Sequence, residues 1–258
     1  MIKIISGWSS VGGSTTAFIN LTNAFNEYGL NATFYGPHDY HLDKCQSGKT
    51  EQFVPEKDDI IISHFMNLVV DKKLVKKHIL SCHESNIFPL RNINLDNYNK
   101  IHFVSDWQQK YHSVKKRYFI LPNVLDDLKQ NDKPNNKIGG VIGSVDYNKQ
   151  THTSVLKALE DGCELVYIFG NVTDQLYFQK NVKDLIGDKV ILYGYCDKQK
   201  MYDMVTDVYQ SSIRETWGYV AGECLLTGTK YHNYGMCNFD IKNVMTKEQI
   251  VERWKKEF

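Results

Sequence analysis

The chain has 258 residues and a formal net charge of +1, from 31 lysines and arginines and 30 aspartates and glutamates. This length predicts one or two domains, because a domain usually takes about 100 to 200 residues. Hydrophobic residues make up 42% and charged residues 24%, which argues against a disordered chain. The balanced charge excludes a general attraction to nucleic acids or membranes, so an anionic partner needs a local basic patch.

No stretch of the sequence resembles an export signal or a membrane span. The apolar run at the N-terminus is too short for a secretory signal, and no later run approaches the roughly 18 apolar residues of a span. The six cysteines lie far apart, without a C-x-x-C pair or a zinc-like spacing with histidine. We therefore expect a cytoplasmic protein with reduced thiols, and leave open a peripheral contact with a membrane or nucleic acid.

The first half of the chain alternates short apolar strands with helix and turn signals, the pattern of a parallel α/β sheet. Gly12 and Gly13 stand between the first strand and the first helix, where they either form a tight turn or let a phosphate or sugar approach the helix N-terminus. Apolar residues at helical spacing follow, and Gly29 ends that helix. Ser105 and Gln108 form a capping box that begins another helix. The predicted strands are residues 3–8, 31–36, 59–65, 78–84, 100–105 and 117–123.

A polar segment with Pro134 and no apolar period, LDDLKQNDKPNNK, indicates a linker after Asn123. A second strand and helix series begins at Ile138, which predicts two α/β halves with a ligand-binding cleft between them. Thr246 and Gln249 make a further capping box that begins a last helix. The predicted strands of this half are residues 139–145, 164–170, 189–195 and 207–212, the predicted helix is 153–160, and the apolar stripe of the last helix is Ile250, Val251, Trp254 and Phe258.

The run SGKT at residues 47–50 matches the end of a phosphate-binding P-loop. Asp43 stands where that motif needs a glycine, and no apolar strand precedes the run. We therefore do not expect a P-loop here.

Residues 211–228, SSIRETWGYVAGECLLTG, carry two acids with seven residues between them. The preceding strand ends at residues 211–212, Glu215 lies in the loop, and a helix is predicted over about residues 217–227. Glu223 lies inside that helix among apolar residues, so its carboxylate should be partly buried and should need a hydroxyl or a cation as partner. Either both acids face one cleft, or both are solvated surface residues.

The same run resembles the E-x7-E signature of retaining glycosyltransferases of the GT-B fold, especially family four. The segment GSVDYNKQ at residues 143–150 is similar to the G-R-x-x-x-x-K-G element of that family, with Gly143 and Lys149 matching. FILPNVLDD, FVSDW and GGSTT are similar to the strand and asparagine that close the first domain, an earlier strand-serine element and the glycine-rich first loop. The resemblance spans nearly the whole chain, and the E-x7-E region is its most specific part.

The resemblance implies two Rossmann-like α/β domains of the GT-B type that face each other across a cleft. It places an N-terminal acceptor domain at residues 1–126, a linker at 127–136 and a nucleotide-sugar domain at 137–245. Residues 246–258 would form a helix that crosses back to the first domain.

The resemblance also implies roles for single residues. Glu223 would accept hydrogen bonds from the ribose hydroxyls of a nucleotide sugar, Glu215 would contact hydroxyls of the transferred sugar, and Lys149 would face the diphosphate. A lysine and helix N-termini stabilise a leaving diphosphate without metal. No D-x-D motif occurs, and we expect neither a metal site nor a cofactor beyond the donor substrate. Further pocket residues would be Gly13, Ser14, Gly143, Ser144, Arg214, Thr216, Trp217 and Gly218, with Tyr195 either stacked on a base or part of the core.

The sequence departs from the family pattern at three places. Ser144 replaces an arginine, so that one of two diphosphate cations is missing, and Arg214 is a candidate to replace it. Gln150 replaces the glycine after the lysine. Residues 229–236, TKYHNYGM, replace an apolar strand and a glycine loop, which leaves the far wall of the nucleotide pocket undefined.

His83 follows a predicted strand at the place where the family often has a histidine that contacts the sugar or the acceptor, and we count it among the catalytic candidates. His64 follows the preceding strand in the same way. A structural histidine is the alternative for both. The basic clusters Lys72–Lys77 and Lys115–Arg117 lie in the N-terminal half, where they form either a solvated surface or a contact for an anionic acceptor.

These features predict a retaining, metal-independent hexosyltransferase that moves a sugar from a nucleoside-diphosphate sugar, preferably a UDP-sugar, to a hydroxyl of a glycan, a lipid or a hydroxylated DNA base. Phospholipid headgroups and lipopolysaccharide are candidate anionic acceptors. Two alternatives remain open at this point. One is a nucleotide-sugar epimerase of the same fold, and the other is a nucleotide-sugar-binding module that has lost its chemistry.

Overall fold

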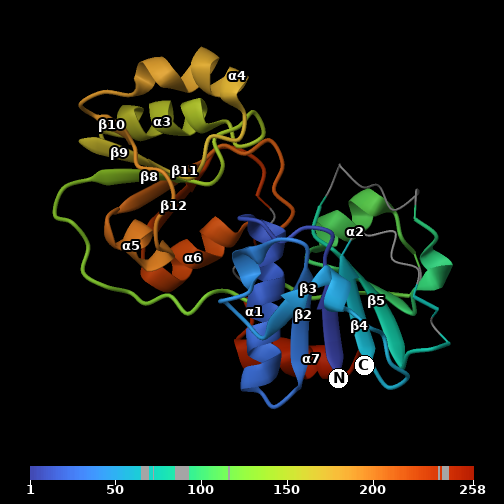
Figure 1. The fold of residues 1–258 in the computed structure, drawn as a ribbon. Coiled ribbons are helices and arrows are strands. Elements are labelled where there is room, and N and C mark those ends of the chain that lie inside the picture. The colour runs from blue at the N-terminus through green and yellow to red at the C-terminus, as the bar shows by residue number, and fades with distance from the viewer. Residues whose placement is uncertain (65–69, 72, 85–92, 116, 238, 240–243) are drawn as a thin grey trace. The chain divides into compact units, whose positions relative to one another are not determined.

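The computed structural model describes residues 1–64, 70–71, 73–84, 93–115, 117–237, 239 and 244–258. The chain forms two compact units, one of Met1–Leu125 with Asp240–Phe258 and the other of Asp126–Phe239. Each unit is a parallel β-sheet covered by helices (Figure 1). In the described part of the chain, no helix is long and apolar enough to cross a membrane.

The N-terminal unit contains a seven-stranded parallel sheet in the order β3-β2-β1-β4-β5-β6-β7. From β1 the chain adds strands first on one side (β2, β3) and then, starting with β4, on the other, as in Rossmann-type sheets. Ligands of such sheets bind at the carboxyl ends of the strands near this switch point. The strands are β1 (Ile2–Ile5), β2 (Ala32–Gly36), β3 (Ser47–Lys49), β4 (Ile60–His64), β5 (Lys77–Cys82), β6 (Lys100–Phe103) and β7 (Tyr118–Ile120).

Three α-helices of the N-terminal unit are α1 (Gly13–Glu27), α2 (Asp106–His112) and α7 (Lys247–Lys255). Helix α1 buries Phe18 and Phe25 completely, and the positive φ of Gly29 (77°) follows its end as predicted. Short 3₁₀ helices lie at Asp39–His41, Thr50–Gln52 and Leu95–Asn97.

The last helix, α7, packs into the core of the N-terminal unit. Its predicted capping box forms, because Thr246 accepts from the backbone of Gln249 and the Gln249 side chain accepts from the backbone of Thr246. Ile250, Val251 and Trp254 are buried in the same cluster as α1 and β1. Burial of an aliphatic side chain such as Ile250 or Val251 contributes about 1.5 to 3 kcal/mol. The C-terminal segment therefore returns to the first unit, as predicted.

In the N-terminal unit, one further prediction is confirmed and another needs correction. The SGKT run lies in and just after the edge strand β3, which confirms that it is no P-loop. The capping box of α2 is only half formed: Ser105 accepts from the backbone N–H of Gln108, but the Gln108 side chain accepts from Val104 N–H and donates to the carbonyl of Glu84. A partner outside the helix has taken the place of the reciprocal bond.

The C-terminal unit contains a five-stranded parallel sheet in the order β10-β9-β8-β11-β12. Its helix α3 begins two residues earlier than predicted and ends before Gly162, whose φ is 82°. The strands are β8 (Ile138–Ile142), β9 (Leu165–Phe169), β10 (Val190–Leu192), β11 (Asp207–Gln210) and β12 (Lys230–Asn233). The α-helices are α3 (Thr151–Glu160), α4 (Gln175–Tyr177), α5 (Lys198–Asp203) and α6 (Tyr219–Thr227), and Phe178–Val182 continues α4 as a π-helix, followed by a 3₁₀ turn at Lys183–Leu185.

Strand β12 lies within TKYHNYGM, where the sequence gives no apolar strand signal. It pairs in parallel with β11 at the edge of the sheet, with Tyr231 opposite Val208. An edge strand pairs with only one other strand and is more exposed than a central one, so it does not need a continuous apolar run. The segment that departs from the family pattern therefore still supplies a strand.

Candidate functional site

Two loops of the C-terminal unit meet at the carboxyl ends of neighbouring strands. One follows β8 and contains residues 143–150, and the other follows β11 and contains residues 211–218. The backbone N–H of Ile213 donates to the carbonyl of Asn148 (2.7 Å), and the Asn148 amide donates to the carbonyl of Arg214 (3.2 Å). These bonds bring the predicted residues of both loops together.

Lys149 and Glu215 form an ion pair at this junction, with 2.6 Å between Lys149 Nζ and Glu215 Oε2. The lysine and glutamate side chains are 25% and 19% exposed, so a ligand can still reach both. The backbone N–H of Lys149 donates to Asp146 Oδ1 (2.8 Å), which fixes the turn that carries the lysine. Lys149 and Glu215, predicted to face different parts of one donor, are thus adjacent.

Two further residues, Gln210 and Tyr231, are connected to Glu215 by hydrogen bonds that the sequence did not predict. Gln210, at the end of β11, donates from Nε2 to the same Oε2 of Glu215 (2.9 Å) and to Ser212 Oγ (3.0 Å). The Tyr231 hydroxyl of β12 donates to Gln210 Oε1 (2.7 Å). No local motif marks Gln210 or Tyr231, because their partners lie on other strands and loops.

The structure explains why the first loop has a glycine at position 143 and what the serine at position 144 contacts. Gly143 has a φ of 135°, which residues with a side chain rarely adopt. Gly170 packs directly against it, because a Cβ on Gly170 would lie 2.0 Å from the Gly143 carbonyl oxygen. Ser144 Oγ donates to Asp146 Oδ2 at 2.5 Å. Ser144 thus contributes a hydroxyl held by an acid where the family pattern has an arginine.

Glu223 is buried, with 2% of the residue exposed. Its Oε1 is 2.6 Å from Lys198 Nζ and its Oε2 accepts from the Tyr202 hydroxyl at 2.6 Å. The predicted partner types, a cation and a hydroxyl, are therefore both present, and the solvated alternative is wrong for this acid. Lys198 also pairs with Asp126, at the start of the unit.

The ionisation of this cluster is set by burial and charge together. Burial raises the pKa of Glu223 above its usual value, against the opposing effects of Lys198 and Tyr202. Burial alone would lower the pKa of Lys198, but attraction to Glu223 and Asp126 outweighs it and raises that pKa. Helices α5, which carries Lys198 and Tyr202, and α6, which carries Glu223, are thereby joined.

The other predicted pocket residues of this unit lie around the start of α6. Gly218 has a φ of 106°, and a Cβ there would lie 2.5 Å from Cys237 Sγ. Trp217 is buried and packs edge-on against Tyr219 and Phe239, so its side chain belongs to the core while its backbone precedes the helix. Thr216 is half-buried, whereas Arg214 is exposed and Tyr195 is 50% exposed.

In the N-terminal unit, Gly13 begins α1 and Ser14 follows it. The Trp8 indole N–H donates to Ser14 Oγ (3.2 Å). A Cβ built on Gly12 or Gly13 meets nothing within 4 Å. The space above this turn is open, so close packing does not require glycine at either position.

His83 lies in a row of buried histidines at the ends of neighbouring strands. Ser81 Oγ contacts both His83 Nε2 (3.0 Å) and His102 Nδ1 (2.8 Å), and the Phe18 ring packs edge-on against His83. Burial, together with His64 and His102, holds the pKa of His83 well below its usual value. A neutral imidazole at this place can position a hydroxyl but does not supply a positive charge.

His64 contacts a serine and a glutamate at its two ring nitrogens. Ser6 Oγ lies 3.0 Å from Nδ1 and Glu84 Oε2 lies 2.6 Å from Nε2. The arrangement resembles a hydrolase triad, but Ser6 is fully buried and its Oγ also accepts from the Trp8 backbone N–H. A buried hydroxyl cannot attack a substrate, so these contacts do not make a nucleophilic site.

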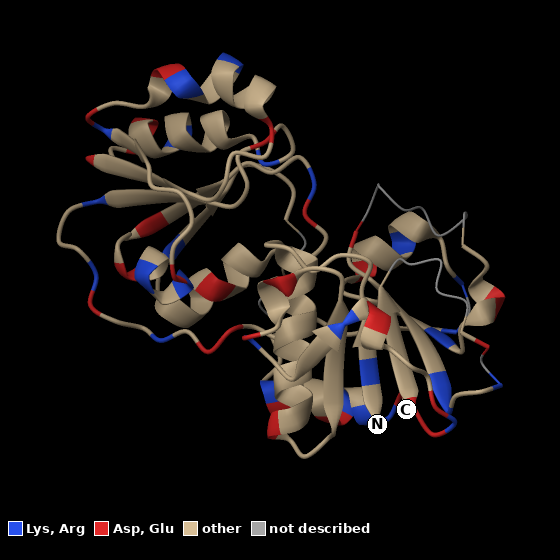
Figure 2. Ribbon diagram, in the orientation of Figure 1, with Lys and Arg blue, Asp and Glu red and all other residues tan. Residues whose placement is uncertain are grey.

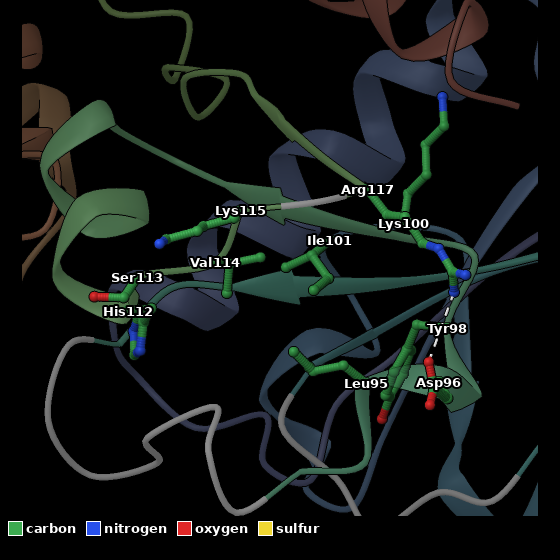
Figure 3. A pocket seen from close by; sticks show the side chains of 10 residues that line it. All are labelled: Leu95, Asp96, Tyr98, Lys100, Ile101, His112, Ser113, Val114, Lys115 and Arg117. Atoms are coloured by element: carbon green, nitrogen blue, oxygen red, sulfur yellow. Dashed lines mark ion pairs between the residues drawn. The ribbon is translucent and has the colours of Figure 1, made fainter.

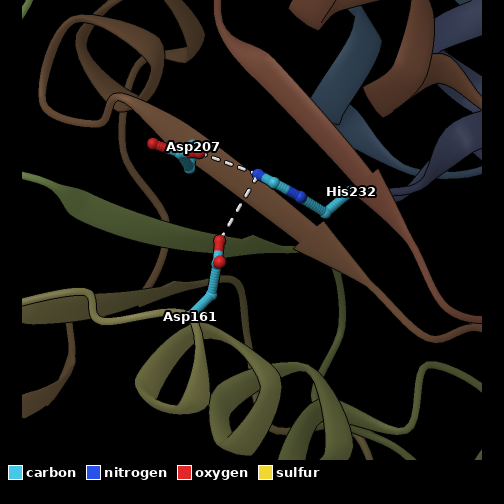
Figure 4. Close-up of side chains that lie close together, drawn as sticks. All are labelled: Asp161, Asp207 and His232. Carbon is cyan, nitrogen blue, oxygen red and sulfur yellow. Dashed lines mark hydrogen bonds and ion pairs between the residues drawn. The ribbon is translucent and has the colours of Figure 1, made fainter.

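A third group, Asp161, Asp207 and His232, gathers two carboxylates and an imidazole within 4.8 Å of one another (Figure 4). His232 Nε2 lies 2.7 Å from Asp207 Oδ1. Asp161 Oδ2 accepts from Lys137 Nζ (2.7 Å) and from the Tyr209 hydroxyl (2.5 Å), which hold the pKa of Asp161 at about 2. Since the lysine already supplies the positive charge, we assign this group to the packing of α3 on the sheet.

Basic and acidic residues are interspersed over both units (Figure 2). Lys72 of the first predicted basic cluster lies outside the described residues, and Lys77 donates to the carbonyl of Glu257 at 2.5 Å. In the second cluster, Lys115 and Arg117 line a pocket of about 520 Å³ with Leu95, Asp96 and Val114 among its other walls (Figure 3), and Lys116 lies outside the described residues. Arg117 pairs with Asp96 at 3.7 Å, and Lys115 extends on another side of the pocket.

No protein-family model matches the chain, and no curated protein matches it in sequence. Solved structures do match. Anabaena Alr3699/HepE in complex with UDP-glucose has a TM-score of 0.67 and 12% identity, and the match covers 99% of this chain and 88% of that one. TarM has a TM-score of 0.70 and 11% identity, with 98% and 90% covered. WaaG, a glycosyltransferase involved in lipopolysaccharide biosynthesis, has a TM-score of 0.64 and 12% identity, with 99% and 90% covered. The chain therefore has the GT-B fold, with two parallel-sheet α/β units.

Proposed function

We propose that this protein is a glycosyltransferase that transfers a sugar from a nucleoside-diphosphate sugar, preferably a UDP-sugar, to a hydroxyl acceptor. The observation that carries the proposal is the Lys149–Glu215 pair at the carboxyl ends of β8 and β11. Ligands of such sheets bind at those ends. Structures of the same fold support the donor class, since HepE is described in complexes with UDP, with UDP and glucose, and with UDP-glucose.

In this proposal the donor separates the two charges. Lys149 turns from the carboxylate of Glu215 to the diphosphate, where it stabilises the negative charge that develops on the leaving group. Glu215 then accepts hydrogen bonds from hydroxyls of the transferred sugar and holds its anomeric carbon toward the acceptor. The ion pair between Lys149 and Glu215 orients both side chains toward the place where the donor is proposed to bind.

Glu223 is proposed to bind the ribose by exchanging a partner. Both of its oxygens have contacts inside the protein, from Lys198 and Tyr202. A ribose diol therefore has to share or replace one of these contacts. Lys198 can keep a carboxylate partner during that exchange, because it also pairs with Asp126.

The test is a thermal-shift screen against nucleoside diphosphates and their sugars, since a ligand that binds only the folded state raises the melting temperature. The proposal predicts a larger shift with UDP and UDP-sugars than with purine nucleotides. The best donor is then incubated with candidate acceptors, and NMR of the product reports the anomeric configuration. Retention is expected, and an inverted product would contradict the retaining assignment.

A nucleotide-sugar-binding module without turnover is the second candidate. It is favoured by Ser144, whose hydroxyl is held by Asp146 where a second diphosphate cation would stand. Donor binding without product across the acceptor screen would select it. Interconversion of the donor sugar with no acceptor present would instead identify an epimerase.

We further propose that an anionic acceptor contacts the pocket lined by Lys115 and Arg117. The pocket lies at the amino ends of β6 and β7, so it suits a charged part of a large acceptor rather than the reacting hydroxyl. Its Arg117–Asp96 pair is long and 61% and 88% exposed, so an anion can replace the acid easily. Lys115→Gln should weaken binding to an anionic acceptor, with Lys110→Gln on α2 as the control. Equal binding by both variants would contradict this role.

A further inference from the structure

The segment after α6 builds a support under the loop that carries Glu215. Strand β12 pairs with β11, and the chain beyond it bonds back to the start of that loop. The backbone N–H of Tyr234 donates to the carbonyl of Gln210, and that of Met236 donates to the carbonyl of Ser212, both at 2.8 Å. Between these residues, a Cβ on Gly235 would lie 2.3 Å from the Ser212 carbonyl oxygen, so the two segments are in direct contact.

The Gln210 side chain connects this support to Glu215. It is buried, with 5% of the residue exposed. Its Nε2 faces Glu215 Oε2 at 2.9 Å and its Oε1 faces the Tyr231 hydroxyl at 2.7 Å. A flipped amide would place Oε1 against the carboxylate, and two acceptors at that distance repel each other. The charge of Glu215 therefore selects the amide orientation, and in that orientation Gln210 Oε1 accepts from the Tyr231 hydroxyl.

Tyr231 remains a hydrogen-bond donor under all ordinary conditions. Burial is the largest of the effects that raise the pKa of its hydroxyl above the usual range. The neutral phenol keeps a proton to donate to Gln210. Tyr231 thus donates to Gln210, and Gln210 donates to Glu215 Oε2. Lys149 binds the same carboxylate oxygen.

We propose that Gln210 and Tyr231 are positioning residues that set the carboxylate of Glu215 for the hydroxyls of the transferred sugar. This inference rests on the proposed function, because it gives Glu215 a sugar ligand. When Lys149 turns to the diphosphate, Gln210 is the donor that stays on Glu215 Oε2. The carboxylate then keeps its orientation during the change of partners, without a second cation that would compete for the diphosphate.

A positioning role for Gln210 predicts different effects on UDP-sugar binding and on UDP binding. Gln210 acts only through Glu215, so its loss should affect ligands that carry a sugar and should spare the nucleotide alone. Gln210→Ala is expected to weaken the affinity for the UDP-sugar by about tenfold, the lower end of the effect of one lost hydrogen bond to a charged group, with the affinity for UDP unchanged. Tyr231→Phe should have the same signature with a smaller effect of roughly threefold.

Gln210→Glu provides a readout that a purely structural role would not give. It places a carboxylate against Glu215, so at neutral pH the two acids compete for Lys149 and UDP-sugar binding falls. At lower pH the two acids share a proton, and part of the binding should return. Wild type should show no comparable gain on acidification.

The experiment is calorimetric titration of wild type, Gln210→Ala, Gln210→Glu and Tyr231→Phe with UDP and with the best UDP-sugar from the thermal-shift screen. Tyr234→Phe is the control, because Tyr234 is 49% exposed on the same segment. A wild type that binds neither ligand would overturn the proposed function itself. If wild type binds both, but Gln210→Ala keeps its ratio of UDP-sugar to UDP affinity or loses both ligands equally, the positioning role is wrong.

Discussion

Two acids of the C-terminal unit have the same partner type at the same distance but lie in different surroundings. Glu215 and Glu223 each pair with a lysine at 2.6 Å. The Glu215 side chain is 19% exposed and that of Glu223 is 3% exposed. The first acid belongs to a loop that a ligand can reach, and the second joins two helices from inside.

The comparison shows that pair geometry alone does not indicate what a carboxylate does. A partly exposed pair contributes little to stability, because water already stabilises both charges, and it can therefore be opened by a ligand at low cost. A buried pair is costly to break, because each group left alone remains desolvated. We infer that Glu215 is the acid that changes partner readily, whereas Glu223 also holds the fold.

The largest effect is expected from the buried acid. Glu223→Ala leaves Lys198 and the Tyr202 hydroxyl without their carboxylate, and should lower the free energy of unfolding by about 3 to 5 kcal/mol. Urea unfolding followed by circular dichroism measures it. A loss below about 1 kcal/mol would show that the Glu223–Lys198 pair contributes no more than an exposed pair, and that the two acids do not differ in their effect on stability.

The histidine row of the N-terminal unit extends the comparison to buried groups without a cation. Burial lowers the pKa of His102 to about 4 from its usual 6.5. The unfolded chain takes up this proton first, so the stabilising contribution is present above pH 6.5 and is lost as the pH falls through about 4. One such histidine accounts for about 3 kcal/mol over that range. Unfolding between pH 7 and 4 should show this loss in wild type and a smaller one in His102→Gln.

Glu223 should have a pH dependence of opposite sign. Because its folded pKa is raised, its contribution is fully present below its usual pKa and is lost as the pH rises through the folded value. This contribution is the free energy of unfolding of wild type minus that of Glu223→Gln, measured at each pH. The value should fall as the pH rises, and a value that grows with rising pH would contradict the direction of the pKa shift.

Lys149 should separate binding from stability. Lys149→Ala removes the cation proposed to contact the diphosphate, and should weaken UDP binding by about 1.5 to 3 kcal/mol, or roughly 10- to 150-fold. Its exposure predicts little change in unfolding. Titration calorimetry at constant salt measures the affinity, and unchanged UDP binding would contradict the proposed contact.

The smallest effect on stability is expected from Glu215 itself. Glu215→Ala should change the free energy of unfolding by less than about 1 kcal/mol, as is usual for a partly exposed pair. Activity or UDP-sugar binding should nevertheless be lost. A variant that unfolds as readily as Glu223→Ala would place Glu215 among the residues that hold the fold.

The sequence predicted much of the fold because strands and helices leave local patterns. The apolar strands, the end of α1 at Gly29 and the stripe of α7 were all visible in the spacing of residues. Strand β12 was missed because an edge strand needs no apolar run. The capping box of α2 is only half formed, because the Gln108 side chain bonds to Val104 and Glu84 outside the helix and not to the backbone of Ser105.

The candidate site was less accessible from the sequence. An acid within an apolar helix predicts a cation and a hydroxyl as partners, and Glu223 has both. Their identities, Lys198 and Tyr202, depend on the packing of two helices and leave no spacing signal. Gln210 and Tyr231 lie on neighbouring strands for the same reason, so only the structure connects them to Glu215.

The proposed role of Glu215 is tested by titration of wild type and Glu215→Gln with UDP and with UDP-glucose under identical conditions. We predict that both proteins bind UDP equally, that wild type binds the sugar donor more tightly than Glu215→Gln does, and that both remain folded. A wild type that binds neither ligand, or a variant that binds the sugar donor as well as wild type, would contradict this role.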